Sequence, residues 1–243
     1  SWEKEAEDIK HMSDADKSMG GPDAIQKPHD RGRLTIRARI ALHLEENSFR
    51  EHGSMSGNAM RDENGNLTEF SPANYITGMG KVENRPIAVG GEDFTLKGGA
   101  PNAAGLRKSV YAEELALNYK VPLVRMLEGG GGSVAGSKGN QGPIGNPVYE
   151  KPRFQSIAKI MSVAPVASAA LGPVAGFPAA RFAASHFSVM TQETSQILIA
   201  GPAVVSRALN TAMTQEELGG YKIHGTNGVA TNIATSEQDA MQQ

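Results

Sequence analysis

The chain has 243 residues, a formal net charge of −2 and 5% aromatic residues. This length suits one large domain or two small ones, and the nearly balanced charge gives no reason to expect nucleic acid or an acidic membrane as a partner. The absence of cysteine excludes a disulfide framework, a thiolate-bound zinc and a cysteine nucleophile.

Residues 1–30 are polar and charged and lack the apolar core of a signal peptide. We expect them to form an N-terminal arm that is disordered or lies on a neighbouring molecule, with one domain over residues 31–243. The uncharged run 163–180 is interrupted by prolines and glycines, which favours a buried core over a membrane span. These features favour a cytoplasmic location, with the mitochondrial matrix as the alternative.

Hydrophobic periodicity predicts an alternation of helices and short strands. Ile36, Ile40 and Leu44 recur at helical spacing behind Thr35, a suitable N-cap. The Gly- and Asn-rich residues 53–71 predict a long loop or hairpin. Helices are expected over residues 35–46, 102–119, 154–161 and 202–210, and strands over residues 75–82, 86–90, 94–96, 120–127, 186–191 and 196–200.

The segment 163–183 predicts a buried strand, a tight turn and a helix start. Its apolar strand is expected to end at Gly172-Pro173, and Phe177-Pro178 to open the helix, because proline suits the first helical position. Main-chain N–H groups at such a turn can hold a bound anion or a developing oxyanion. An ordinary buried packing step explains the same pattern, so both interpretations stay open.

The recurring order of strand, glycine turn and helix indicates an α/β fold with helices on both faces of a sheet. Ligands of such folds bind at the carboxyl ends of strands. Two of these ends are glycine-rich here, at residues 129–132 and 172–176.

Conventional catalytic patterns are missing: there is no HExxH, Walker A or GxSxG motif, and the histidines have no metal-ligand spacing. No metal site is therefore expected. We interpret the acidic pairs Glu92-Asp93 and Glu113-Glu114, and the basic cluster Arg33, Arg37 and Arg39, as solvated charges. A reaction that relies on main-chain donors needs few reactive side chains, since one oxyanion donor contributes about 3 to 4 kcal/mol.

Six motifs nevertheless follow one another in a recognisable order. They are Arg37–Ile40 with Asn47–Phe49, Gly78–Val82 with Asp93–Gly99 (similar to DFTVxGG), Leu127–Gly131 (in the place of DSGGAR), Leu171–Gly176 (similar to GPCAGG), Ile199–Val204 (similar to ITGPxV) and Glu217–Ala230 (similar to ELGG…H…SGVAH). With these motifs the chain resembles the carboxyltransferase (beta) subunits of biotin-dependent acyl-CoA carboxylases and the related decarboxylases.

The resemblance implies a crotonase-like (ClpP-like) ββα spiral core with flanking helices, and an acyl-CoA carboxyltransferase N-terminal-type domain over residues 31–243. It implies transfer of a carboxyl group from carboxybiotin to the α-carbon of an acyl-CoA. The biotin is carried on a separate protein or domain. The implied partners are a biotinylated carrier, a biotin carboxylase subunit, a C-terminal carboxyltransferase half and further copies in an oligomer.

The resemblance also implies site residues. The N–H groups of Gly176 and Phe177 would hold the thioester oxyanion. The acyl-CoA site would be lined by Gly130, Gly131, Gly172 and Ala175, and CoA phosphates would meet Lys97, Arg107 and Lys108. The same three cations are equally well read as solvated.

Three departures from the family pattern matter. Phe177 replaces the second glycine of the AGG motif, the arginine of DSGGAR is absent, and the second half of the family's chain does not follow within these residues. Two other functions stay open: a non-catalytic assembly half whose site Phe177 closes, and a crotonase-type hydratase or decarboxylase. The latter needs a side-chain acid or base beside the turn, and the sequence identifies none.

Overall fold

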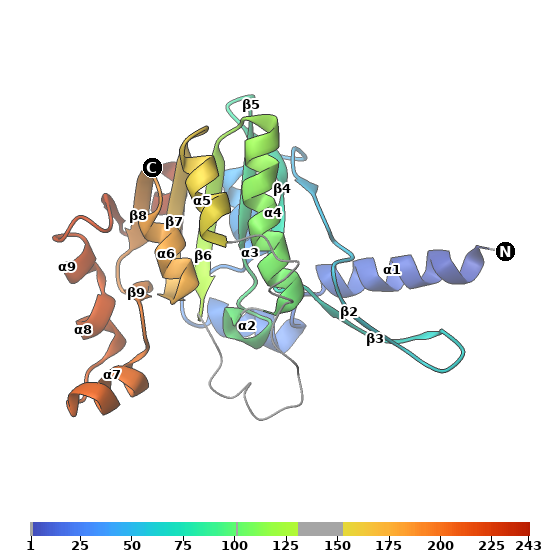
Figure 1. Cartoon of the computed structure of the whole chain (residues 1–243), viewed down its shortest axis with the longest axis horizontal. Coiled ribbons are helices and arrows are strands. Elements are labelled where there is room, and N and C mark those ends of the chain that lie inside the picture. Colours follow the sequence, from blue (N-terminus) through green and yellow to red (C-terminus); the bar gives the residue numbers. More distant parts are fainter. Residues whose placement is uncertain (1, 101, 131–152) are drawn as a thin grey trace.

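The computed structural model describes residues 2–100, 102–130 and 153–243 (Figure 1). The helices are α1 Glu3–Lys17, α2 Pro22–His29, α3 Ile36–His43, α4 Ala103–Tyr119, α5 Arg153–Met161, α6 Phe177–Ala183, α7 Pro202–Leu209, α8 Gln215–Gly219, α9 Tyr221–His224 and α10 Glu237–Gln242, with a 3-10 turn at Lys97–Gly99. The strands are β1 Arg50–Glu51, β2 Gly57–Arg61, β3 Leu67–Pro72, β4 Tyr75–Val82, β5 Arg85–Glu92, β6 Leu123–Gly129, β7 Val166–Ala175, β8 Phe187–Thr191, β9 Gln196–Leu198 and β10 Asn232–Ala234.

Eight of the strands in these ranges form one sheet, in the order β1-β4-β5-β6-β7-β8-β10, with β9 also paired to β7. Strands β1, β4 and β5 are antiparallel neighbours, and β5 to β8 run parallel. The predicted α/β class is therefore confirmed. In Figure 1, α4, α5 and α6 lie on one face of the sheet and α3 lies behind it.

The sheet separates two apolar layers, because successive side chains of a strand point to opposite faces. On one face Met126 and Leu171 pack with Ile36 and Ile40 of α3, and all four are at most 2% exposed. On the other face Leu123 packs among the small residues of α4. No helix within the described ranges combines the length and the apolarity needed to cross a bilayer.

Local signals set the start of several helices as expected. Thr35 caps α3 by accepting a hydrogen bond from the N–H of Ala38. Asn102 caps α4 in the same way, and Thr214 and Glu217 form a capping box at the start of α8. Residues 53–71 contain the antiparallel hairpin of β2 and β3, one of the two forms predicted for them.

Two predictions about strands are wrong: one segment is not a strand, and one strand is longer than expected. Residues 94–96 form a turn, because the carboxylate of Asp93 accepts the N–H of Thr95 at 2.9 Å and its carbonyl accepts that of Leu96. Strand β7 does not end at Gly172-Pro173. It continues to Ala175, because Val174 pairs both with Gly129 of β6 and with β9.

The expectation of disorder is wrong for most of residues 1–30, which form α1 and α2. Asp16 at the end of α1 is 2% exposed, and the N–H of Gly20 donates to Thr95 Oγ1 at 2.9 Å. Figure 1 shows α1 extending from the body of the molecule beside the β2–β3 hairpin. The division at residue 30 stays a prediction.

A buried ion cluster, which we call the Glu128 cluster, joins the α3 face of the sheet to α10. The carboxylate of Glu128 accepts from both Arg33 and Arg39. Arg39 also donates to Glu237 of α10 at 2.6 and 2.8 Å, and it is fully buried. The solvated interpretation of Arg33 and Arg39 is therefore wrong.

A second cluster fixes α1. Arg37 donates to Asp16 at 2.5 Å and to Glu51 at 2.7 Å, and Lys108 Nζ lies 3.8 Å from Glu51. Burial, and then the neighbouring Glu51 carboxylate, raise the pKa of Asp16 to about 7. Arg37 is thus not a free surface charge either.

We predict that Arg39→Ala lowers the free energy of unfolding by about 3 to 5 kcal/mol, because it leaves two buried carboxylates without their shared cation. Urea unfolding measures this loss. The exposed Arg85 provides the control, and Arg85→Ala should change the stability by less than about 0.5 kcal/mol. A comparable, small effect for both variants would contradict the role given to the Glu128 cluster.

A pH-dependent stability follows from Asp16. Since its pKa in the folded chain lies above the usual 3.8, its contribution to stability is full below about pH 4 and is lost as the pH rises through 7. Asp16→Asn should therefore remove part of this pH dependence and be at least as stable as the parent protein at pH 8. Thermal unfolding between pH 4 and 8 checks this, with the exposed Asp14→Asn on the same helix as the control.

Candidate functional site

The carboxyl ends of β6 and β7 meet at one edge of the sheet. Gly129 at the end of β6 is in register with Val174 of β7. A side chain at Gly129 would come within 2.7 Å of the carbonyl oxygen of Gly99, so only glycine allows the 3-10 turn to approach this closely. The ends of β6 and β7, which are the two glycine-rich strand ends identified in the sequence, are therefore neighbours in the sheet.

The turn after β7 is tight and depends on glycine. Gly176 has φ of +68° and ψ of −124°, a backbone conformation that side-chain-bearing residues rarely adopt. Helix α6 starts at the next residue, Phe177, with Pro178 in its first turn as predicted. The N–H of Gly176 donates to the carbonyl of Leu198 at 2.9 Å, so β9 occupies one of the two donors expected to face a ligand.

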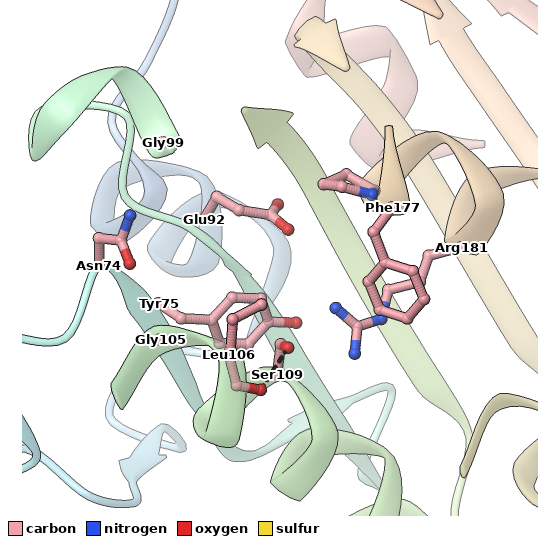
Figure 2. A pocket seen from close by; sticks show the side chains of 10 residues that line it. Asn74, Tyr75, Glu92, Gly99, Gly105, Leu106, Ser109, Phe177 and Arg181 are labelled. Atoms are coloured by element: carbon pink, nitrogen blue, oxygen red, sulfur yellow. Dashed lines mark hydrogen bonds between the residues drawn. The ribbon is translucent and has the colours of Figure 1, made fainter. Parts of the chain in front are cut away.

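A small pocket of about 30 Å³ lies beside this turn, between the ends of β4 and β5 and the helices α4 and α6 (Figure 2). It is lined by Asn74, Tyr75, Glu92, Gly99, Gly105, Leu106, Ser109, Phe177, Pro178 and Arg181. In Figure 2 the carboxylate of Glu92, the hydroxyl of Tyr75 and the guanidinium of Arg181 all point into the space between them.

Strand register and two glycines build this pocket. Tyr75 and Glu92 are direct partners in the antiparallel pair β4–β5, so their side chains emerge together at its end. A side chain at Gly90 would come within 2.8 Å of the Tyr75 hydroxyl, and one at Gly105 within 2.2 Å of the Asn74 side chain. Glycine at these two positions leaves the room that the polar side chains occupy.

Behind the pocket lies a third buried ion cluster, which we call the Glu113 cluster. Glu113 of α4 accepts from Arg125 of β6 at 3.0 Å and from Arg181 of α6 at 2.9 Å. Ser156 of α5 also donates to it. All three charged residues are at most 2% exposed, so the solvated interpretation of Glu113 is wrong.

Glu92 is the carboxylate within the pocket itself. Burial raises the pKa of Glu92, while the positive charge of Arg181 lowers it by a smaller amount. Its Oε2 accepts the N–H of Glu128 at 3.3 Å. Burial also raises the pKa of Tyr75, and the nearby Glu92 adds to this effect. The pocket therefore brings a buried carboxyl with a raised pKa together with a guanidinium, where the sequence analysis interpreted Glu92 as a solvated charge.

The structure places the predicted ligand residues in different surroundings. Lys97 and Arg107 are exposed, as cations that meet phosphates need to be. Lys108 is 4% exposed and its Nζ lies 3.8 Å from the Glu51 carboxylate, so this burial does not favour a contact with a CoA phosphate, and that assignment stays a prediction. Gly130 has open space beside it, whereas Gly131 lies outside the described residues.

Two further predicted positions support the fold around the site. A side chain at Gly172 would come within 2.4 Å of the Glu128 carboxylate, so this glycine makes room for the Glu128 cluster. Ala175 is the last residue of β7 and is paired with Leu198. Phe177 lies with its ring 5.3 Å from that of Phe154 and 4.5 Å below the Arg181 guanidinium, at the rim of the pocket.

The sequence interpretation missed Glu92, Glu113 and Arg181 as site residues. One signal was available: Arg181 is the first charge after an uncharged run that starts at Val163, and Arg125 interrupts an apolar strand. A charge within an apolar segment is seldom buried unless it is paired. Which carboxylate pairs with it could not be found from spacing.

Among the residues that the structure describes, no group of three or more His, Cys, Asp or Glu side chains is arranged to hold a metal ion. The polar groups of the pocket are one guanidinium, one carboxyl, two hydroxyls and one amide. Such a set binds and orients organic groups through hydrogen bonds.

Comparison with known proteins gives a family and a fold. The family described as the carboxyl transferase domain matches residues 27–243. The beta5 subunit of the biotin-dependent acetyl-/propionyl-coenzyme A carboxylase of Mycobacterium tuberculosis is 33% identical over 90% of this chain and 39% of its own length. The alpha subunit of methylmalonyl-CoA decarboxylase of Veillonella parvula is 28% identical over 93% of this chain and 44% of its own length.

Among solved structures, transcarboxylase 12S with methylmalonyl-coenzyme A bound superimposes with a TM-score of 0.78 at 23% identity. The alignment covers all of this chain and 46% of the transcarboxylase chain. This likeness confirms the crotonase-like fold. The chain spans about two fifths of the length of the curated relatives it matches.

Proposed function

This chain belongs to the carboxyl transferase domain family, and on that premise we propose that it is the acyl-CoA-binding half of a biotin-dependent carboxyltransferase. In this role it contributes to moving a carboxyl group onto the α-carbon of an acyl-CoA. The relatives named above support the class of reaction, and the site geometry supports a thioester site beside the Gly176 turn.

The observation that carries the proposal is the convergence of β6, β7 and the Gly176 turn beside one polar pocket. Gly129 and Val174 are in register, and the turn that follows β7 contributes Phe177 and Pro178 to the pocket rim. A ligand at the carboxyl ends of these parallel strands would therefore contact both the turn and the pocket. This is the arrangement that a thioester needs when its carbonyl and its acyl chain are held by different groups.

This proposal includes the N–H groups of Gly176 and Phe177 as donors to the thioester oxyanion, on one condition. Because the Gly176 N–H is bonded to Leu198, it can reach a thioester oxygen only if β9 moves away from the turn. Strand β9 has three residues and pairs only with β7 among the described strands, so its displacement breaks a short ladder. It also separates the Ile197 carbonyl from His224 Nε2 and exposes the buried Ile197 and Leu198. An enolate at this position would then be stabilised by main-chain donors.

Biotin, bound to a separate carrier protein or domain, would supply the carboxyl group. The family resemblance assigns the biotin-side oxyanion hole to the second half of the family's chain, and we assign no described residue to biotin. What this chain provides is a thioester site at the sheet edge, with Lys97 and Arg107 exposed for the CoA phosphates. A C-terminal half, a biotinylated carrier, a biotin carboxylase subunit and further copies in an oligomer are the partners that this role requires.

The small volume of the pocket favours a second candidate, a non-catalytic assembly half. The Phe177 ring stands at the rim, and about 30 Å³ holds no more than a small group. Isothermal titration calorimetry with propionyl-CoA separates the two functions. Saturable binding supports the acyl-CoA-binding half, and no binding at millimolar ligand supports the assembly half.

One observation from the structure supports a third candidate, a crotonase-type hydratase or decarboxylase. Such an enzyme needs a side-chain acid or base beside the turn, and Glu92 lies in the pocket that the turn borders. Turnover of an enoyl-CoA or of methylmalonyl-CoA without any biotin compound would establish this activity in place of carboxyl transfer.

We predict that Gly176→Ala lowers kcat/KM for carboxyl transfer about 100-fold, because a displacement of about 1 Å at a reacting centre has an effect of this size. The positive φ also makes the variant less stable, by about 1 to 3 kcal/mol. Both values are measured in the intact carboxylase that contains this chain, by steady-state kinetics and thermal unfolding.

Gly201→Ala is the matched control, because Gly201 also precedes a helix with a proline in its first turn, but it has φ of −72° and open space beside it. It should keep the kcat/KM of the parent enzyme. Equal activity of the two variants would contradict the role of the Gly176 turn.

A further inference from the structure

The guanidinium of Arg181 is incompletely paired although it is buried. Its Nε donates to Glu113 at 2.9 Å, and its plane lies 4.5 Å above the Phe177 ring. Its Nη2 has no hydrogen-bond partner among the described residues, and the residue is 2% exposed. A buried donor without a partner is unfavourable, and more so when it belongs to a charged group. In Figure 2 this guanidinium points into the pocket, which indicates a group that binds there.

The charges of the Glu113 cluster do not balance. Glu113 carries one negative charge, and Arg125 and Arg181 carry two positive charges, so the cluster keeps one excess positive charge in a water-poor interior. The other ionisable carboxyl that lines the pocket is Glu92. Burial favours its neutral form, and in that form the excess positive charge has no counterion.

The size and the remaining lining of the pocket define the missing group. Its volume of about 30 Å³ accommodates about two water molecules or one carboxylate. The hydroxyl of Tyr75 points into the same space as Arg181 (Figure 2), whereas Asn74 and Ser109 already donate to the carbonyls of Ala100 and Leu106. Leu106 and Phe177 form apolar walls. A planar anion with two oxygens suits a guanidinium edge better than a spherical ion does.

We propose that this pocket is a binding site for a carboxylate group, held by the free edge of Arg181. The carboxylate has two possible sources: a small free acid, or the carboxyl group of a carboxylated acyl-CoA whose thioester lies at the Gly176 turn. The second source rests on the proposed function, and the first does not. In either case Glu92 opposes the binding when it is ionised and permits it when it is neutral.

The first experiment measures the binding of acetate, with acetamide as its uncharged counterpart, by NMR titration of the intact protein at pH 6. The parent protein should bind acetate and not acetamide. Arg181→Gln should weaken acetate binding at least tenfold, whereas Glu92→Gln should bind acetate at least as tightly as the parent protein, because it carries no competing charge. The exposed Arg207→Gln is the control and should change nothing.

A loss of acetate binding in Arg181→Gln that is absent from Glu92→Gln is what a purely structural role would not produce. If Arg181→Gln does not fold, Glu92→Gln still tests the proposal, because acetate binding that is weaker in this variant, or that is absent from the parent protein, overturns it. Acetate binding that survives unchanged in a folded Arg181→Gln protein overturns it as well.

The second experiment compares methylmalonyl-CoA with propionyl-CoA by calorimetry. A preference for methylmalonyl-CoA that disappears in Arg181→Gln identifies the substrate carboxyl as the bound group. If neither thioester binds while acetate binding still depends on Arg181, the proposed function fails but the carboxylate site stands. If both thioesters bind equally well to the parent protein and acetate does not bind, the carboxylate site is overturned and the proposed function stands.

Discussion

The architecture depends on two buried carboxylates, Glu113 and Glu128, which lie on opposite faces of the sheet. Each carboxylate accepts from two arginines. An unpaired carboxylate in such an interior costs several kcal/mol. Each cluster is therefore complete only when the elements that carry its charged groups are docked. The Glu128 cluster requires α3 and α10, and the Glu113 cluster requires α4, α6 and β6. Apolar packing alone would tolerate small slips of these helices, whereas the directional ion pairs do not.

The same pairing creates the candidate site. Because Glu113 is shared, it satisfies only one edge of Arg181, and the other edge faces the pocket beside the Gly176 turn. Gly90 and Gly105 then make the room in which Tyr75 and Asn74 lie. The structural ion cluster and the polar pocket thus belong to one arrangement, in which the paired groups of the Glu113 cluster end at the unpaired Nη2 of Arg181.

The sequence motifs point to main-chain groups, whereas in the folded chain side chains line the pocket. The motifs directed attention to the amides of residues 176 and 177, but β9 holds the Gly176 N–H in a strand hydrogen bond. Glu92 and Arg181, which no motif marked, face the pocket instead. A catalytic role for the turn consequently involves a rearrangement of β9, while the pocket groups are already in position.

The sequence by itself determined the class of the fold, several helix starts and the family. Hydrophobic periodicity and capping residues act within a few positions, so Thr35 and the Thr214–Glu217 box were readable locally. Only the tertiary structure decided which charged side chains are buried and which partners they have. Arg39 pairs with residues 89 and 198 positions away, and Glu113 with residues 12 and 68 positions away. A charge on a short amphipathic segment has the same local pattern whether it meets water or a distant carboxylate, and the difference arises only when the sheet brings the two together.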